Sequence, residues 1–182
     1  MFNSKKITTK ELCLIAMFIA LTVILGYVSG FLRVGNISKI SVSFVSVYLA
    51  AAAFGPWIGG FVAAMADFIS FLANPTGMYL WQLTVVEFIF GFLFGVFFSR
   101  KKQIRIPYLN LNVKILIYSV IQFAINMVIK TLILQSVGFV SADFYVAFIQ
   151  RLPGCMVAFV LNFVVLNLFE RFVPGIIRVV RK

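Results

Sequence analysis

Histidine is absent from this 182-residue chain, and only two cysteines and five acidic residues are present. The sequence contains no C-x-x-C pair, no G-x-x-x-x-G-K-[ST] motif and no serine beside a plausible general base. We therefore expect no metal site, no other cofactor, no ATP hydrolysis by a P-loop and no serine-nucleophile catalysis. If the protein moves a solute uphill, the energy must come from a partner or from an ion gradient.

Apolar residues are abundant instead, at 63% of the chain, with a mean hydropathy of +1.08. A soluble domain of this size would leave much of that surface in water, whereas a membrane-spanning helix needs about 20 largely apolar residues. The sequence therefore predicts an all-α integral membrane protein, in which residues 1–182 form one membrane domain of six transmembrane helices. The expected spans are Thr9–Ser29, Ser41–Phe54, Trp57–Ala73, Tyr79–Ser99, Val113–Val137 and Phe144–Phe172.

The ends of these spans carry two local signals. Thr8 and Glu11 have the spacing of a capping box, which marks the start of the first helix. The second and third spans are short and are separated only by Gly55 and Pro56, a pair that breaks a helix. We therefore expect these two helices to be tilted or to cross the membrane only in part.

Positive charge is distributed unevenly along the chain, whose net charge is +11. Twelve of the sixteen lysines and arginines lie before the first span, between the fourth and fifth spans, or at the end of the last. Six crossings put these clusters on one face, and the positive-inside rule assigns that face, with both termini, to the cytoplasm. The loops on the opposite face hold only two basic residues, Arg33 and Lys39. Because no basic stripe is interleaved with exposed aromatics, a nucleic-acid partner is not expected.

Several polar residues lie inside the spans, where an ionisable side chain is costly and therefore marks a functional hypothesis. Helices of opposite direction carry most of them in the half nearer the outer face, so we expect them to meet in one outward-opening cavity. The fifth helix presents Ser119, Gln122, Asn126 and Lys130 along one face. The candidate binding residues, two of them from an outer loop, are Arg33, Lys39, Asp67, Asn74, Tyr79, Trp81, Gln82, Glu87, Asn126, Lys130 and Arg151.

The charges of these candidates lean positive, which favours an anionic solute. Arg151 can hold a carboxylate through two hydrogen bonds, and Asp67 can pair with adjacent N–H donors of a heterocycle. Trp81 can supply a stacking face for a ring. The alternative is that the charges only form internal salt bridges, such as Asp67 with Arg151 or Glu87 with Lys130.

Small residues recur at helical spacing on two spans. Ala16 and Ala20 lie four residues apart on the first helix, and Gly91 and Gly95 repeat that interval on the fourth. Small residues at this spacing let another helix approach closely. For each pair the sequence leaves open whether that neighbour belongs to the same chain or to a partner.

The loops and the deeper polar residues carry weaker signals. Gly30–Ile40 and Asn74–Tyr79 are placed over the expected cavity mouth, where they either close as a lid or serve as connectors. Asn162 and Asn167 lie deeper in the sixth span, and we expect them to make hydrogen bonds between helices.

One stretch of the chain resembles a known family. Lys39–Gly77 reads K-I-S-V-S-F-V-S-V-Y-L-A-A-A-A-F-G-P-W-I-G-G-F-V-A-A-M-A-D-F-I-S-F-L-A-N-P-T-G. It resembles the substrate-binding S components of energy-coupling factor (ECF) vitamin transporters, most nearly their folate family. That family has a K-I-S-F-like entry to the second helix, an F-G-P turn, a small-residue-rich third helix ending in an aspartate, and then N-P-T-G.

The resemblance implies a function and partners. It implies a non-enzymatic membrane subunit that binds folate from outside and delivers it through a transmembrane coupling protein driven by two ATPase subunits. Ala16 and Ala20 would dock on the coupling protein, Asp67 would lie by a pterin-like ring, and Arg151 would pair with a carboxylate. The Gly30–Ile40 and Asn74–Tyr79 loops would close over the solute.

Two departures from the family pattern keep the solute open. After N-P-T-G the family continues with Y/F-F-P-G-F-T, where this chain has Met78-Tyr79-Leu80-Trp81, and the tryptophan expected three residues after Asn126 is isoleucine. Folate is the first expectation, and pantothenate or another small vitamin is the second. A membrane enzyme that uses Asp67 and Glu87 as acid and base, or a structural subunit without a solute, is the alternative of another class.

Overall fold

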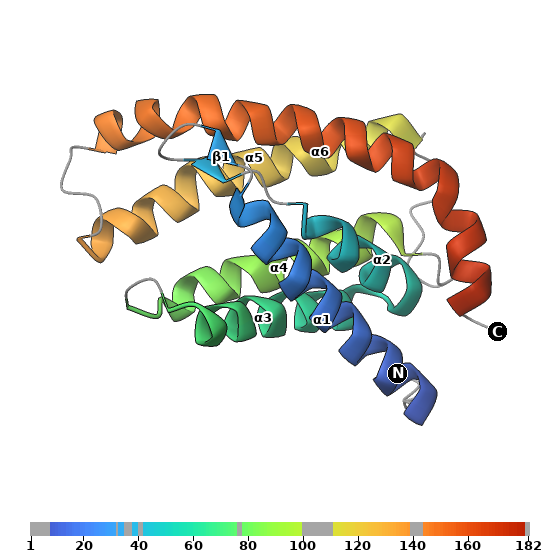
Figure 1. Ribbon diagram of the computed structural model, residues 1–182. Helices are drawn as coiled ribbons and strands as arrows, with labels where there is room; N and C mark the ends of the chain where they lie inside the picture. Colours follow the sequence, from blue (N-terminus) through green and yellow to red (C-terminus); the bar gives the residue numbers. More distant parts are fainter. Residues whose placement is uncertain are drawn as a thin grey trace, which may run out of the picture.

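The computed structural model describes residues 8–31, 33–34, 38–39, 42–75, 78–99, 111–138 and 144–180. Within these residues the chain folds into a bundle of six helices and one short hairpin (Figure 1). The hairpin pairs β1 (Arg33–Val34) antiparallel with β2 (Ser38–Lys39). The helices are α1 (Thr9–Phe31), α2 (Phe44–Phe54), α3 (Pro56–Ala73), α4 (Trp81–Phe98), α5 (Leu111–Ser136) and α6 (Phe144–Val180).

The all-helical prediction is confirmed, and five of the six helices are long and apolar enough to cross a membrane. The exception is α2, whose 11 residues are too few to span. Gly55 ends α2 with a positive φ of 101°, and Pro56 begins α3 at once, because a proline in the first turn costs no hydrogen bond. The expected shortness therefore applies to α2, whereas α3 has 18 residues and is long enough to span.

The start of α1 and the end of α6 can each be compared with the sequence prediction. At the start of α1 the capping box is present: Thr8 N–H donates to Glu11 Oε2 at 3.0 Å, and Glu11 N–H donates to Thr8 Oγ1 at 3.4 Å. The last span was expected to end at Phe172, close to the Phe144–Phe169 segment that is long and apolar enough to cross a membrane, and α6 itself continues through Pro174 to Val180. Its 37 residues amount to roughly 55 Å of helix measured along the axis, more than the hydrocarbon thickness of a bilayer, and Figure 1 shows the helix bending near its C-terminal end.

Close packing of α3 on α4 depends on glycine. A methyl group at Gly91 would collide with the carbonyl oxygen of Gly59, and one at Gly95 would collide with the backbone of Pro56. A methyl group at Gly59 of α3 would lie 2.5 Å from Ala51 Cβ of α2 and 2.7 Å from the carbonyl oxygen of Gly91. The Gly91 and Gly95 pattern thus serves packing within this chain, which settles the question left open by the sequence.

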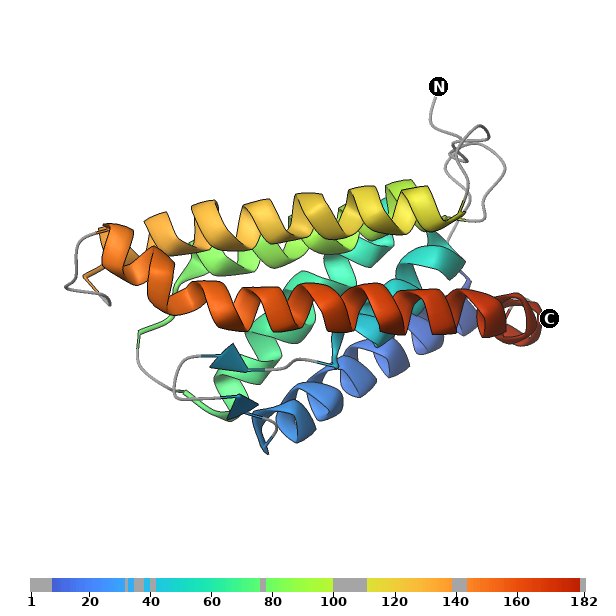
Figure 2. The same cartoon turned by 90° about the horizontal axis from the view of Figure 1, so that it is seen from above.

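Two groups of buried side chains hold the helices together. Around α2, α4 and α5, the rings of Phe94 and Tyr118 stack with centroids 4.2 Å apart, and Tyr48 meets Phe94 edge to face at 5.6 Å. A second group joins α1 to α2, where Ser46 Oγ donates to the Phe18 carbonyl at 3.0 Å. Figure 1 shows α5 and α6 side by side along one edge of the bundle, and in Figure 2 the hairpin lies beside α6.

Candidate solute-binding cavity

A cavity of about 530 Å³ lies inside the bundle. This volume is within the range of roughly 300–1,000 Å³ that is usual for small-molecule sites. All six helices contribute to its wall, which mixes rings with charged and neutral polar groups. The polar and aromatic lining residues include Thr22, Ser43, Phe44, Asp67, Ser70, Glu87, Phe90, Phe94, Ser119, Gln122, Phe123, Asn126, Lys130, Arg151, Cys155, Phe159 and Asn162.

The four ionisable residues expected to meet do line this cavity together. Asp67 and Lys130 lie six residues before the ends of α3 and α5, and Glu87 and Arg151 lie six and seven residues after the starts of α4 and α6. Because these four ends face the same side of the bundle in Figure 1, all four residues lie roughly 10 Å from that side. We call this set the charged level.

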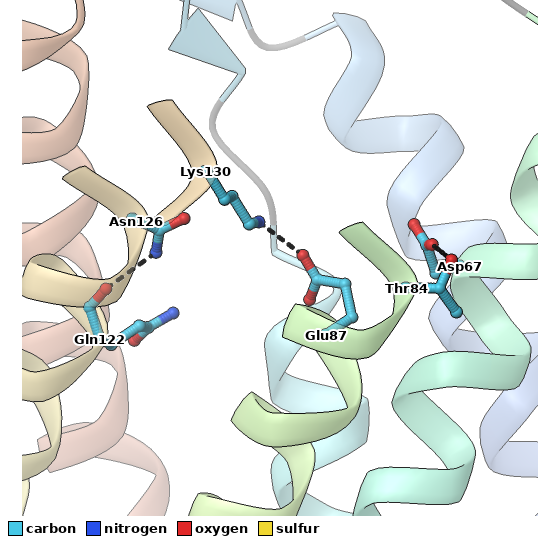
Figure 3. A network of polar contacts seen from close by, with 6 residues as sticks. All are labelled: Asp67, Thr84, Glu87, Gln122, Asn126 and Lys130. Carbon is cyan, nitrogen blue, oxygen red and sulfur yellow. Dashed lines mark hydrogen bonds and ion pairs between the residues drawn. The ribbon is translucent and has the colours of Figure 1, made fainter. Parts of the chain in front are cut away.

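One of the two expected salt bridges is present. Lys130 Nζ lies 2.6 Å from Glu87 Oε1, joining α5 to α4, as Figure 3 shows. The ammonium group also lies 5.3 Å from the centroid of the Phe90 ring, within range of a cation–π contact. Glu87 and Lys130 therefore neutralise each other within the cavity wall.

Asp67 takes part in a chain of hydroxyl groups instead of pairing with Arg151. Thr84 Oγ1 donates to Asp67 Oδ2 at 2.6 Å, and Tyr79 Oη lies 2.7 Å from the same Thr84 oxygen (Figure 3 shows the first bond). Since a hydroxyl has one proton to donate, Tyr79 is the donor to Thr84. The Tyr79 ring packs against Phe68 and Phe71 with centroids 5.6 and 4.9 Å away. The segment before α4 is thus tied to the cavity wall.

Arg151 is the cation of the charged level without a carboxylate partner among the described residues. Its Nη1 donates to Thr131 Oγ1 of α5 at 3.3 Å, and the side chain is half-buried. A guanidinium group has five donor hydrogens, so most of its hydrogen-bonding capacity remains for a ligand.

A second polar group lies deeper, between α5 and α6. Asn162 Nδ2 donates to Gln122 Oε1 at 3.0 Å, which confirms the expected hydrogen bond between helices. Asn126 Nδ2 donates to the Gln122 backbone carbonyl at 3.1 Å. Asn167 was also expected to make a hydrogen bond between helices, but its amide donates to the carbonyl of Phe163 within its own helix.

Other expected site residues lie away from the cavity wall. Asn74 and Trp81 are exposed, Trp81 to 63%, and Gln82 is half-buried without lining the cavity. The backbones of Arg33 and Lys39 face each other in the hairpin, and their side chains lie outside the described residues. Contact of any of these residues with a solute stays a prediction.

The sequence supplied a signal for three polar residues of the site that were not chosen as candidates. Ser119 and Gln122 belong to the same polar face of α5 as Asn126 and Lys130. Thr84 lies one turn before Glu87 on α4 and reaches Asp67. The whole polar face of α5 lines the cavity, and not only the two residues chosen from it.

The comparison with protein families gives a clear result. A family model for the S component of the ECF-type riboflavin transporter matches residues 6–171. The chain thus belongs to the membrane-embedded, substrate-binding S components of ECF transporters, as the sequence resemblance predicted. These are transporter subunits and not enzymes, so catalysis by Asp67 and Glu87 is not their role.

Individual relatives point to another vitamin than the family model does. The folate transporter FolT of Clostridium novyi (strain NT) is 28% identical over 99 residues, and the match spans 54% of each chain, about half the length of that relative. A crystal structure of FolT bound with folic acid has a TM-score of 0.73 and 22% identity, covering 88% of this chain and 92% of that one. At this identity the likeness shows the fold.

Proposed function

We propose that the cavity binds a folate-like vitamin, a heterocycle that carries carboxylates. The observation that carries this proposal is Arg151, which lines the cavity without a carboxylate partner among the described residues. Glu87 pairs with Lys130, and the Asp67 carboxylate accepts from Thr84, so a carboxylate of the ligand can take the hydrogen bonds that Arg151 still has to offer. The name of the C. novyi relative supports this assignment.

Riboflavin is the second candidate, because the matching family model bears its name. Riboflavin has no carboxylate: its ribityl hydroxyls can accept hydrogen bonds from Arg151 but bring no negative charge to the guanidinium. Pantothenate, the rival expected from the sequence, has a carboxylate but no ring. The aromatic part of the wall, which includes Phe90, Phe123 and Phe159, suits a ring-bearing ligand better.

We further propose an orientation in the membrane and a surface for the coupling protein. The start of α1 and the end of α6 lie on the same side of the bundle in Figure 1, and the distribution of lysine and arginine assigns that side to the cytoplasm, so that the charged level faces outward. Ala16 and Ala20 are exposed on α1, where they let a helix of the coupling protein approach closely. Two ATPase subunits bound to that protein supply the energy that this chain cannot generate.

Calorimetric titration of the detergent-solubilised protein with folic acid, riboflavin and pantothenate tests the proposal. We expect tight binding of folic acid, and a roughly 10- to 100-fold loss of affinity in Arg151→Gln, the usual size for a lost charge-assisted hydrogen bond. Lys10→Gln on the exposed start of α1 removes the same charge outside the cavity and should bind folic acid like the wild type. Wild-type affinity in Arg151→Gln, or binding of riboflavin but not folic acid, would refute the assignment.

A further inference from the structure

We propose that Ser119, Gln122 and Asn162 form a neutral site that binds the lactam edge of the solute's heterocycle, that is, its adjacent N–H and C=O groups. We call these three residues the neutral level. This inference rests on the proposed function and deepens it, because it says which part of the ligand lies where.

The two amides present a matched donor and acceptor to the cavity. Asn162 Nδ2 donates to Gln122 Oε1, which leaves Gln122 Nε2 and Asn162 Oδ1 without partners among the described residues. If both amides are turned over, one N–H and one C=O still remain. Figure 3 shows the Gln122 side-chain nitrogen directed into the space between α5 and α4. A lactam edge offers the complementary acceptor and donor side by side.

Ser119 provides a second, independent observation. It lies one turn before Gln122 on α5, its side chain is 2% exposed, and it belongs to the cavity wall. Its Oγ has no hydrogen-bond partner in the described part of the chain. Since a buried hydroxyl without a partner is costly, a ligand atom that reaches this part of the wall gains a hydrogen bond there.

The neutral level lies too far from the charged level to bind the same end of a ligand. Gln122 precedes Lys130 by two helical turns, and Asn162 follows Arg151 by three, so the levels are roughly 12–16 Å apart along the helices. Phe123 and Phe159 lie beside the neutral level with their rings edge to face at 5.9 Å. An elongated ligand with its ring among these residues and its carboxylates near Arg151 fits this arrangement.

The lactam edge is shared by the two vitamins that the comparisons name. The pterin of folic acid and the isoalloxazine of riboflavin both carry an N3–H next to C4=O. Both ligands therefore satisfy the neutral level, whereas only folic acid brings carboxylates to Arg151. The neutral level selects the class of heterocycle.

The test compares folic acid with its N3-methyl derivative, which lacks the N3–H whichever way round the two amides lie. We expect the wild type to bind folic acid roughly 10- to 100-fold more tightly, because the derivative leaves one amide group of the site without its partner. The double variant Gln122→Met and Asn162→Leu, which removes both amides and keeps side chains of similar length, should bring this preference close to 1. Asn167→Leu removes an amide of α6 that does not line the cavity, so this matched control should keep the preference for folic acid.

Three results would overturn the inference: no preference in the wild type, an unchanged preference in the double variant, or loss of the preference in Asp67→Asn alone, which would put the ring at the charged level. If the wild type binds riboflavin and not folic acid, the folate proposal fails by itself. The lactam edge is then tested in the same variants with riboflavin and its N3-methyl derivative, which lacks the N3–H. A wild type that binds neither vitamin overturns both proposals.

Discussion

Breaking the ion pair between Glu87 and Lys130 should destabilise the bundle. The two charged groups lie 2.6 Å apart, and the side chains are 34% and 19% exposed respectively. Exposed ion pairs contribute about 0.2–1 kcal/mol, whereas loss of one partner from a fully buried pair costs about 3–5 kcal/mol. Partial burial places this pair between those limits, and we expect a coupling free energy of about 2 kcal/mol.

A double-mutant cycle measures this coupling without the other effects of each substitution. Glu87→Gln leaves the ammonium group of Lys130 unpaired, Lys130→Met leaves the carboxylate of Glu87 unpaired, and the double variant leaves neither. Each kcal/mol shifts the unfolding midpoint by roughly 2–4 °C in a chain of this size, so each single variant should melt about 4–8 °C below the wild type. With a coupling of about 2 kcal/mol, the double variant should melt about as far below the wild type as each single variant does, and not twice as far.

The assay is thermal unfolding of the ligand-free protein in detergent, followed by the fluorescence of its two tryptophans. Midpoints are compared at one scan rate, because unfolding of membrane proteins is often irreversible. Additive shifts, with a coupling below about 0.3 kcal/mol, would refute the reasoning and would mean that the two charges are solvated independently.

Three further predictions concern the cavity, the partner surface and the packing. Cys13→Ser leaves Cys155, which lines the cavity, as the one cysteine in the chain. In this background, saturating folic acid should slow labelling of Cys155 by a thiol reagent roughly 10- to 100-fold, because the bound vitamin covers the thiol. Ala16→Trp should lower the yield of complex with the coupling protein without affecting vitamin binding. Gly95→Ala should prevent folding or destabilise the protein strongly, because its methyl group meets the backbone at the start of α3.

Each of these predictions has a control. Labelling of Cys155 that folic acid does not slow would place the bound vitamin outside the cavity. Val120→Trp puts the same bulk on an exposed position of α5, and an equal loss of complex there would argue against an interface on α1. Gly26→Ala has open space around it and should fold normally; stability of Gly95→Ala equal to that of Gly26→Ala would contradict the packing of α3 on α4.

The helices could be predicted from the sequence because their signals are local. Long apolar runs give the spans, and the capping box at Thr8 and the break at Gly55 and Pro56 give individual ends. The last span, predicted as Phe144–Phe172, agrees closely with the Phe144–Phe169 segment that is long and apolar enough to cross a membrane, and the helix itself continues through Pro174 to Val180. A single proline in a long helix is therefore a weak boundary signal.

Depth along a helix could also be predicted, but rotation about the helix axis could not. Counting residues from the span ends placed Asp67, Glu87, Lys130 and Arg151 at one level, because each residue adds a fixed rise. Which charges pair depends on how each helix is turned, so the Glu87–Lys130 bridge and the Thr84–Asp67 bond required coordinates. Trp81 fits the same rule, since its depth was suitable but its side chain is exposed.

The separation of the two levels offers a physical reason why the family model and the individual relatives name different vitamins. A neutral donor–acceptor pair such as Gln122 with Asn162 accepts any ring with a lactam edge, because it adds no charge requirement. A cation at the other end, such as Arg151, favours a carboxylate and leaves a neutral tail unmatched. By this proposal the identity of the vitamin is determined at Arg151, and substitutions at Gln122 or Asn162 should weaken every ligand that carries a lactam edge alike.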